Sequence, residues 1–406
     1  MMRWCRRGSL MILLGLLVAG LVLIWGKPFW PIYAPRGTTT NQPNITLFFA
    51  NIHQLRVEPA EVLKTCQNKK VDVLVIVPTS AANHEAREAV RKSWNGNFPA
   101  NWPVMFYLGA TNNPRLQNEI TEEGRQYGDI TQDDSFLDSY NNLTLKSLSL
   151  VSWAHKFCKN ANYVLKIDDD VFLNTKKFHD LIICITSARN DIYMKLFQKN
   201  TVTLGEGGDL LDKLEEESMQ PTYSSEYSVC ESFNPYGLIN YYVNAKSHDY
   251  ESYIFGGYLY KGVQADRNPS SKWYLDRSVY RYDRLPPFLS GTAYIMSSNI
   301  IPHLLREAKQ HPVIALEDVY MSGIIGSQGL KLKLSHLDGW SRFRPQWDSV
   351  CTYNELLTAH GLSPAELSSM SLAVASLDNG TCDGILTNIL NNINFLISYL
   401  FPRVSK

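Results

Sequence analysis

The feature that most constrains the fold is an alternation of short apolar segments with segments of helical spacing. Residues 71–78, VDVLVIVP, form a continuous apolar run, as a strand buried in a parallel sheet requires. Residues 84–94 follow with helical spacing. The further predicted strands are 104–109 and 163–167, and the further predicted helices are 113–128 and 141–158. This alternation predicts an α/β domain, with a parallel sheet covered by helices on both faces.

Three consecutive carboxylates, Asp168, Asp169 and Asp170, follow the predicted strand 163–167 directly. In parallel sheets, ligands bind beyond the carboxyl ends of the strands. One aspartate would be explained as the cap of the next helix, whereas three in a row are better explained by a bound cation. A hard cation held by one or two carboxylates and completed by substrate phosphates is the Mg²⁺ or Mn²⁺ pattern.

Residues 10–26, LMILLGLLVAGLVLIWG, carry no charge and are close to the shortest stretch that spans a bilayer. Three arginines precede them, so we expect residues 1–9 to be cytosolic and the rest of the chain to be lumenal. The alternative is a cleaved signal peptide. No convincing small-residue cleavage site is present, and Trp25 and Trp30 suit a membrane interface. The sequence therefore predicts a type II signal-anchor.

Glycosylation and cysteine patterns agree with a lumenal domain. Asn44, Asn142 and Asn379 begin N-glycosylation triplets. Six cysteines follow the predicted anchor, enough for three disulfides, and Cys351–Cys382 is the favoured pair. None of the cysteines has zinc-type spacing. The 39 basic and 39 acidic residues leave no net charge, which argues against a nucleic-acid partner.

The domain organisation follows from shifts in composition. We expect a Pro-, Asn- and Thr-containing stem over 27–69, a catalytic domain over 70–345 and a C-terminal extension over 346–406. An acidic, weakly periodic insertion interrupts the catalytic domain at about 186–250. Residues 330–336 are predicted as a late strand, and 385–401 as an amphipathic helix that docks on the protein rather than spanning the membrane.

Six sequence blocks occur in an order typical of one known family. They are REAVRKSW (87–94), FYLG (106–109), YGDITQDDSFLDSYNNLTLKS (127–147), KIDDDVFLN (166–174), PPFLSGTAYIMS (286–297) and EDVYMSG (317–323). A lone Asp-x-Asp is a weak signal, but six blocks in order are a strong one. The chain resembles the β1,3-glycosyltransferases of the galactosyltransferase-like family 31 from about Val71 to Phe343. It departs from the family at Ala293, where a glycine is usual, which bears on acceptor choice.

The resemblance implies a GT-A Rossmann-like fold whose metal is Mn²⁺ or Mg²⁺ and whose donor is a UDP-sugar. Asp170 would be the main metal ligand, with Asp168 facing the ribose or a metal-bound water. Asp169 would contact the donor or only cap the next helix. His336 would complete the metal shell, although a lone histidine is more often structural.

The family's Glu-Asp-Val block implies that Asp318 is the general base, supported by Glu317. The alternative is that both acids only begin a helix. Arg87, Arg91 and Lys146 would contact the donor diphosphate, or they would be anchored in salt bridges. Trp273 and Phe288 would stack on the acceptor sugar, or they would be core aromatics.

These residues together predict a Golgi membrane glycosyltransferase, with the endoplasmic reticulum as an alternative. It would move a hexose, with galactose favoured, from a UDP-sugar to the 3-hydroxyl of a glycoprotein, glycolipid or proteoglycan glycan, inverting to a β1,3 linkage. N-acetylglucosamine and N-acetylgalactosamine are the alternative sugars. Rival functions are a catalytically inactive lumenal chaperone or scaffold, and a glycan-binding membrane protein. The sequence leaves open whether the protein is a homodimer.

Overall fold

The computed structural model describes residues 45–94, 97–198, 230, 233–243, 250–345, 349–377 and 382. The predicted tail and anchor (1–26), the triplets at Asn44 and Asn379, most of the insertion and the predicted helix 385–401 lie outside these residues. Within the described part of the chain, no helix is long and apolar enough to cross a membrane.

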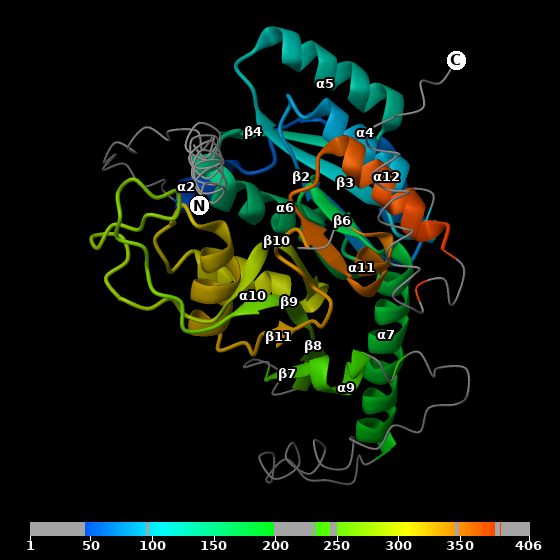
Figure 1. Cartoon of the computed structure of the whole chain (residues 1–406). Coiled ribbons are helices and arrows are strands. Elements are labelled where there is room, and N and C mark those ends of the chain that lie inside the picture. The colour runs from blue at the N-terminus through cyan, green and yellow to red at the C-terminus, as the bar shows by residue number, and fades with distance from the viewer. Residues whose placement is uncertain are drawn as a thin grey trace, which may run out of the picture.

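An eight-stranded sheet forms the centre of the molecule (Figure 1). Its strands, in spatial order, are β1 (Leu55–Val57), β4 (Ile130–Leu137), β3 (Val104–Ala110), β2 (Val71–Pro78), β5 (Ala161–Ile167), β10 (Phe288–Ser297), β9 (Phe255–Tyr260) and β11 (Ser335–His336). The four strands from β4 to β5 run parallel, as the alternation predicted. Antiparallel β10 and β9 then extend the sheet beyond β5. Two small sheets pair β12 (Thr358–His360) with β6 (Val171–Leu173), and β7 (Asn240–Val243) with β8 (Tyr250–Tyr253).

The three helices predicted at 84–94, 113–128 and 141–158 are present as α4, α5 and α6, and the structure describes seven more. The helices are α2 (Ile45–Asn51), α3 (Ala60–Asn68), α4 (His84–Trp94), α5 (Pro114–Tyr127), α6 (Leu143–Phe157), α7 (Thr175–Gln198), α9 (Pro235–Leu238), α10 (Ile301–Ala308), α11 (Val350–Glu355) and α12 (Pro364–Ala375). Short 3₁₀ turns, η1 (Tyr140–Asn142) and η3 (Ser298–Ile300), and a π-helix, η4 (Val319–Gly329), complete the set. The predicted helix 84–94 matches α4 residue for residue.

Alternate residues of β2 point into two separate cores, because successive side chains of a strand face opposite sides of the sheet. Leu74 and Ile76 pack in a cluster with α6, α10 and η4. Val73 and Val75 pack in a cluster with α4, α7 and α12. The result is a three-layer α/β domain, which confirms the predicted class.

The predicted stem boundary at residue 69 is wrong. Residues 45–69 pack onto the domain: β1 pairs antiparallel with β4, and Phe48 and Val62 are buried in the core. The prediction failed because these short elements lack the sustained periodicity that identifies a longer helix or strand.

The predicted boundary at residue 345 is wrong for the same reason. β12 pairs antiparallel with β6, which follows the aspartates, and α12 packs against α4. The predicted strand 330–336 shrinks to Ser335 and His336, which pair with β9. Residues 349–377 are therefore part of the catalytic domain.

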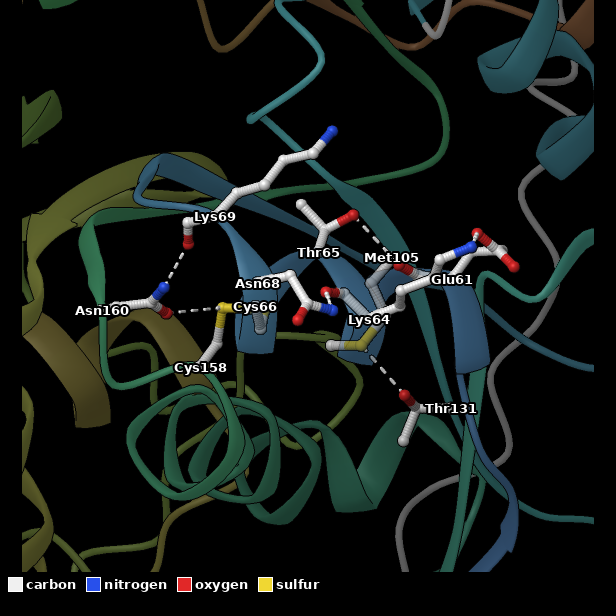
Figure 2. Close-up of a disulfide and its surroundings, with 10 residues drawn as sticks. All are labelled: Glu61, Lys64, Thr65, Cys66, Asn68, Lys69, Met105, Thr131, Cys158 and Asn160. Atoms are coloured by element: carbon white, nitrogen blue, oxygen red, sulfur yellow. Dashed lines mark hydrogen bonds and ion pairs between the residues drawn. A yellow bond between two sulfur atoms is a disulfide. The ribbon is translucent and has the colours of Figure 1, made fainter.

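Three disulfides stabilise the domain, and the favoured pair, Cys351–Cys382, is confirmed. The other pairs are Cys184–Cys230 and Cys66–Cys158. Figure 2 shows the second of these, which joins α3 to the residue that ends α6. Beside it, the side-chain amide of Asn160 donates a hydrogen bond to the Lys69 carbonyl. This bridge holds the residues just before β2 against those just before β5.

We predict that the bridges differ in their effect on stability according to loop length. Cys66–Cys158 closes a loop of 92 residues and Cys351–Cys382 a loop of 31. Chain entropy alone gives about 5 and about 4 kcal/mol respectively. Paired Cys→Ala variants, measured by urea unfolding, should show the greater loss for Cys66–Cys158. A greater loss for Cys351–Cys382 would contradict this order.

Candidate active site

The three aspartates form a tight turn between β5 and β6, at the carboxyl edge of the sheet. The backbone N–H of Asp168 donates to the Thr292 carbonyl of β10 at 2.9 Å. The Val171 N–H donates back to the Asp168 carbonyl at 3.4 Å. All three aspartates are partly exposed. The turn therefore presents carboxylates where a parallel sheet binds its ligands.

Asp169 is fixed to the loop that follows β2. One of its oxygens accepts hydrogen bonds from the Thr79 hydroxyl at 2.5 Å and the Asn83 amide at 3.0 Å. The buried Lys146 ammonium supports this loop by donating to the Thr79 carbonyl at 2.8 Å, and it pairs with Asp138 at 2.6 Å. Both of these Lys146 contacts are to protein groups, so the lysine positions the loop that binds Asp169.

Asp170 faces a residue that sequence reasoning missed. Its carboxylate lies 3.3 Å from Nε2 of His360, which ends β12. The N–H groups of Gly361 and Leu362 both donate to the Asp170 carbonyl, at 3.1 and 3.0 Å. The hydrogen bond that His360 donates to the Asp170 carboxylate raises the pKa of His360. The turn and β12 are thus fastened together through backbone and side chain.

The structure brings His360, and not the predicted ligand His336, beside Asp170. His336 lies on β11, with β9 and β10 between it and β5, and its Nδ1 accepts the Leu259 N–H at 3.2 Å. His360 was missed because it is a lone histidine in a three-residue strand, and only the long-range pairing of β12 with β6 brings it to Asp170.

A carboxylate is a ligand that suits Mn²⁺ and Mg²⁺, and the imidazole of histidine is a common metal ligand. Asp170 and His360 are both partly exposed and close enough to share one ion. Among the described residues, no group of three or more His, Cys, Asp or Glu side chains could hold a metal. Asp170 and His360 are therefore two side chains at this turn that fit a metal ion.

Glu317 and Asp318 lie at the start of η4, beside β10. Glu317 is buried, and its Oε1 accepts the Tyr294 hydroxyl at 2.7 Å. Asp318 caps η4 by accepting the Val319 N–H at 2.8 Å, and its other oxygen accepts the Gly291 N–H at 3.3 Å. Burial and then the Glu317 charge raise the pKa of Asp318 to about 6. A carboxylate with that pKa is suited to accepting a proton near neutral pH.

Gly291 is required where β10 passes the two acids. A Cβ at this position would lie 3.2 Å from a Glu317 oxygen and 3.3 Å from the Asp318 Cβ. Such contacts are tighter than ordinary van der Waals packing, so a side chain here would displace the carboxylates. The glycine thus lets the backbone donate its N–H to Asp318 at close range.

Lys166 joins the aspartate turn to these acids. Its buried ammonium contacts Asp168 at 2.5 Å and donates to the Gly291 carbonyl. Burial opposes its charge, but Asp168 and then Glu317 outweigh that effect and raise the pKa of Lys166. Burial raises the pKa of Asp168 to about 7, with Lys166 opposing the shift and Asp170 adding to it.

For Arg87 and Arg91 the structure shows the salt bridges that the sequence offered as the alternative to a diphosphate contact. Arg87 is buried, donates to Glu123 at 2.7 and 2.8 Å, and holds the Ser80 carbonyl at 2.6 Å. Arg91 forms a two-point ion pair with Asp129 at 2.8 and 2.9 Å. Although burial raises the pKa of Glu123, the arginines lower it to about 2. Both guanidinium groups are therefore occupied by protein carboxylates.

A cavity of about 650 Å³ opens beside the Asp169 loop. Residues 80–82 and 110–114 line it with Leu116, Leu137 and Asp138, so it lies beyond the carboxyl ends of β2, β3 and β4. On the opposite side of the site, Phe288 is buried and stacks on Tyr260 at 4.7 Å. Trp273 is 55% exposed. Of the two predicted sugar platforms, Phe288 is therefore buried, whereas Trp273 is exposed, with the Lys272 ammonium 4.6 Å from its ring centre.

Comparisons with known proteins agree on one family. Residues 85–228 and 231–338, over half of the chain, match the family model described as Galactosyltransferase. Beta-1,3-galactosyltransferase 5 of Homo sapiens is 26% identical over 307 residues, which cover 74% of this chain and 78% of the relative. Beta-1,3-galactosyltransferase 1 of Mus musculus is 25% identical over 367 residues, which cover 85% of this chain and 92% of the relative.

Among solved structures, S. aureus TarS 1-349 gives a TM-score of 0.32 at 13% identity, over 83% of this chain and 76% of that one. So slight a likeness carries no argument. The ordered blocks and the family match lead to one conclusion: the chain belongs to the galactosyltransferase family and is a glycosyltransferase of the β1,3-galactosyltransferase-like kind.

Proposed function

We propose that this protein is a type II Golgi membrane enzyme of GT-A architecture that transfers galactose from UDP-galactose to the 3-hydroxyl of an acceptor glycan. The transfer inverts the donor's α linkage to β. Support for the sugar and the linkage comes from the relatives, which are named beta-1,3-galactosyltransferases. Support for the membrane anchor comes from the uncharged residues 10–26 behind an arginine cluster.

The observation that carries this proposal is the junction at Lys166. Its ammonium touches Asp168 and the Gly291 carbonyl, while the Gly291 N–H binds Asp318. The aspartate turn and the raised-pKa Asp318 are therefore joined through one glycine of β10. An inverting transfer needs the diphosphate leaving group on one side of the reacting sugar and the nucleophile on the other. In this proposal the aspartate turn serves the diphosphate and Asp318 serves the nucleophile.

The donor would lie along the carboxyl edge of the sheet. The cavity beside residues 80–82 and 110–114 is the place for the uridine. Asp170 and His360 would hold Mn²⁺, or Mg²⁺, against the diphosphate. When bound, the ion acts as a Lewis acid that offsets the charge on the departing UDP. Asp168 would then face the ribose or a metal-bound water.

Asp318 performs the proton transfer in this mechanism. Its carboxylate takes the proton of the acceptor 3-hydroxyl as that oxygen attacks the anomeric carbon. A new carbon–oxygen bond forms on one face of the sugar while the bond to UDP breaks on the other. The bonding electrons leave with the β-phosphate oxygen, and no covalent enzyme intermediate forms. Burial, and then the charge of Glu317, which is held by Tyr294, keep the pKa of Asp318 high enough for the carboxylate to act as a base.

A direct test is transfer by the purified full chain in detergent. UDP-galactose, UDP-N-acetylglucosamine and UDP-N-acetylgalactosamine would be compared on β-linked acceptors, with Mn²⁺ and with chelator. Metal-dependent turnover on UDP-galactose supports the proposal, and turnover on another donor corrects the sugar. Tight UDP binding without turnover on any acceptor would favour an inactive lumenal chaperone. Binding of glycan without UDP would favour a lectin.

The pH dependence follows from Asp318. Because a base must be ionised, kcat/KM should be at its plateau above the pKa of about 6 and fall about tenfold per pH unit below it. Asp318→Asn should lower kcat by about 100-fold or more and abolish this limb. Measuring UDP binding at each pH distinguishes a loss of activity caused by protonation of Asp318 from one caused by weaker donor binding at the metal site. A variant that keeps the wild-type profile would rule out Asp318 as the base.

The metal assignment predicts opposite results for two histidines. His360→Ala should weaken Mn²⁺ binding in the presence of UDP by at least about tenfold, since even changes outside a ligand shell have effects of this size. His336→Ala, on β11, is the matched control and should leave the affinity unchanged. Isothermal titration of Mn²⁺ measures both. Weaker binding for His336→Ala alone would restore the original assignment.

A further inference from the structure

The guanidinium of Arg342 lies in a cage of aromatic rings that the mechanism above does not use. Its central carbon is 4.2 Å from the ring centre of Phe343, 4.3 Å from that of Tyr260 and 4.7 Å from that of Tyr258. Its Nη1 also donates to the Tyr260 hydroxyl. We call these four residues the Arg342 cage.

The Arg342 guanidinium has few polar partners among the residues that the structure describes. Among the ion pairs of the described residues, none joins Arg342 to a carboxylate, and its Nε is buried without a hydrogen-bond acceptor. The neighbouring Arg344 is different, because it pairs with Glu366 at 2.9 Å. Ring faces attract a cation but accept few of its five N–H groups. The cage therefore has donors left for an anion.

The cage lies beside the general base. In the register of β9 against β10, Leu289 pairs with Leu259 and Tyr294 with Gly257, so the segment from Ser290 to Ala293 bulges opposite Tyr258. That bulge contains Gly291, whose N–H binds Asp318. Burial raises the pKa of Tyr260; Arg342 opposes this shift, and the charge of the Asp318 carboxylate adds to it. The sheet register and the effect of the Asp318 charge on Tyr260 both place the cage close to Asp318.

The cage is also on the acceptor side of the site. Two strands, β10 and β5, separate β9 from β2, whose loop binds Asp169. The aspartate turn follows β5, whereas Tyr258 and Tyr260 belong to β9. A group bound by Arg342 would therefore approach Asp318 from the side opposite to the Asp169 loop and its cavity.

We propose that Arg342 binds an anionic group of the acceptor glycan, so that the preferred acceptor is an acidic saccharide carrying a carboxylate or a sulfate ester. Guanidinium recognises both groups through paired N–H donors. The caging rings would pack against the apolar face of the same sugar. The inference rests on the transferase function proposed above and specifies its substrate class.

The test compares acceptors that differ only in charge. The full chain in detergent would be assayed with a β-galactoside, its 6-sulfated form, and matched disaccharides ending in glucose or glucuronic acid. We expect kcat/KM to be about tenfold or more higher for the anionic member of at least one pair, the usual size of a charge-assisted hydrogen bond. Arg342→Gln should abolish the preference and Arg342→Lys should retain part of it. Arg344→Gln is the matched control and should leave it unchanged.

The outcomes separate this inference from the proposed function. Turnover without any preference for the anionic acceptors would overturn the inference and leave the transferase intact. A preference that survives Arg342→Gln would also overturn it. If Arg342→Gln instead weakens UDP binding, the cage serves the donor diphosphate and the inference is wrong. Preference for sulfate alone, or for carboxylate alone, supports it and identifies the anion. Absence of UDP binding in the wild type would overturn the proposed function itself.

Discussion

One buried ammonium group, that of Lys166, holds the acidic parts of the site together. Asp168, Glu317 and Asp318 all act on its charge. Two like charges 4 Å apart repel by about 4 kcal/mol at the effective dielectric constant of a protein near its surface. Three carboxylates around one point would therefore be hard to bury unless a cation lay between them. Lys166 supplies that cation from the middle of the sheet, on β5, where the backbone fixes its direction.

The sequence predicted the central strands and helices well because these elements depend on patterns among residues close together in the chain. Apolar runs marked the central parallel strands, and helical spacing marked α4 to within a residue. The aspartate turn was found because carboxylates directly after a buried strand need an explanation. Glu317 and Asp318 were found only through the resemblance, since two acids before a helix are common. What each of them contacts required the structure.

The contacts that the sequence did not predict share one cause, which is pairing between residues far apart in the chain. His360 reaches Asp170 only because β12 pairs with β6. Arg87 and Arg91 were expected at the donor because their i, i+4 spacing gives a basic helix face. Glu123 and Asp129, over thirty residues later, neutralise that face instead. Spacing within one helix says nothing about acids that arrive from elsewhere. Arg342 was overlooked for the same reason, since its cage is assembled from β9 and a loop about eighty residues later.

The pairing of β12 with β6 has a consequence for how the protein is made. A growing chain displays the aspartate turn long before residue 360 leaves the ribosome. Before residue 360 is added, the parallel strands β2, β3 and β5 and all six sequence blocks of the family have already been synthesised. Domains acquire structure from the N-terminus during synthesis. Until β12 is made, β6 therefore has no antiparallel partner beside Asp170. The pairing of β12 with β6 then brings His360 to Asp170. A product terminated before β12 would carry all six sequence blocks of the family but would lack His360 at the site.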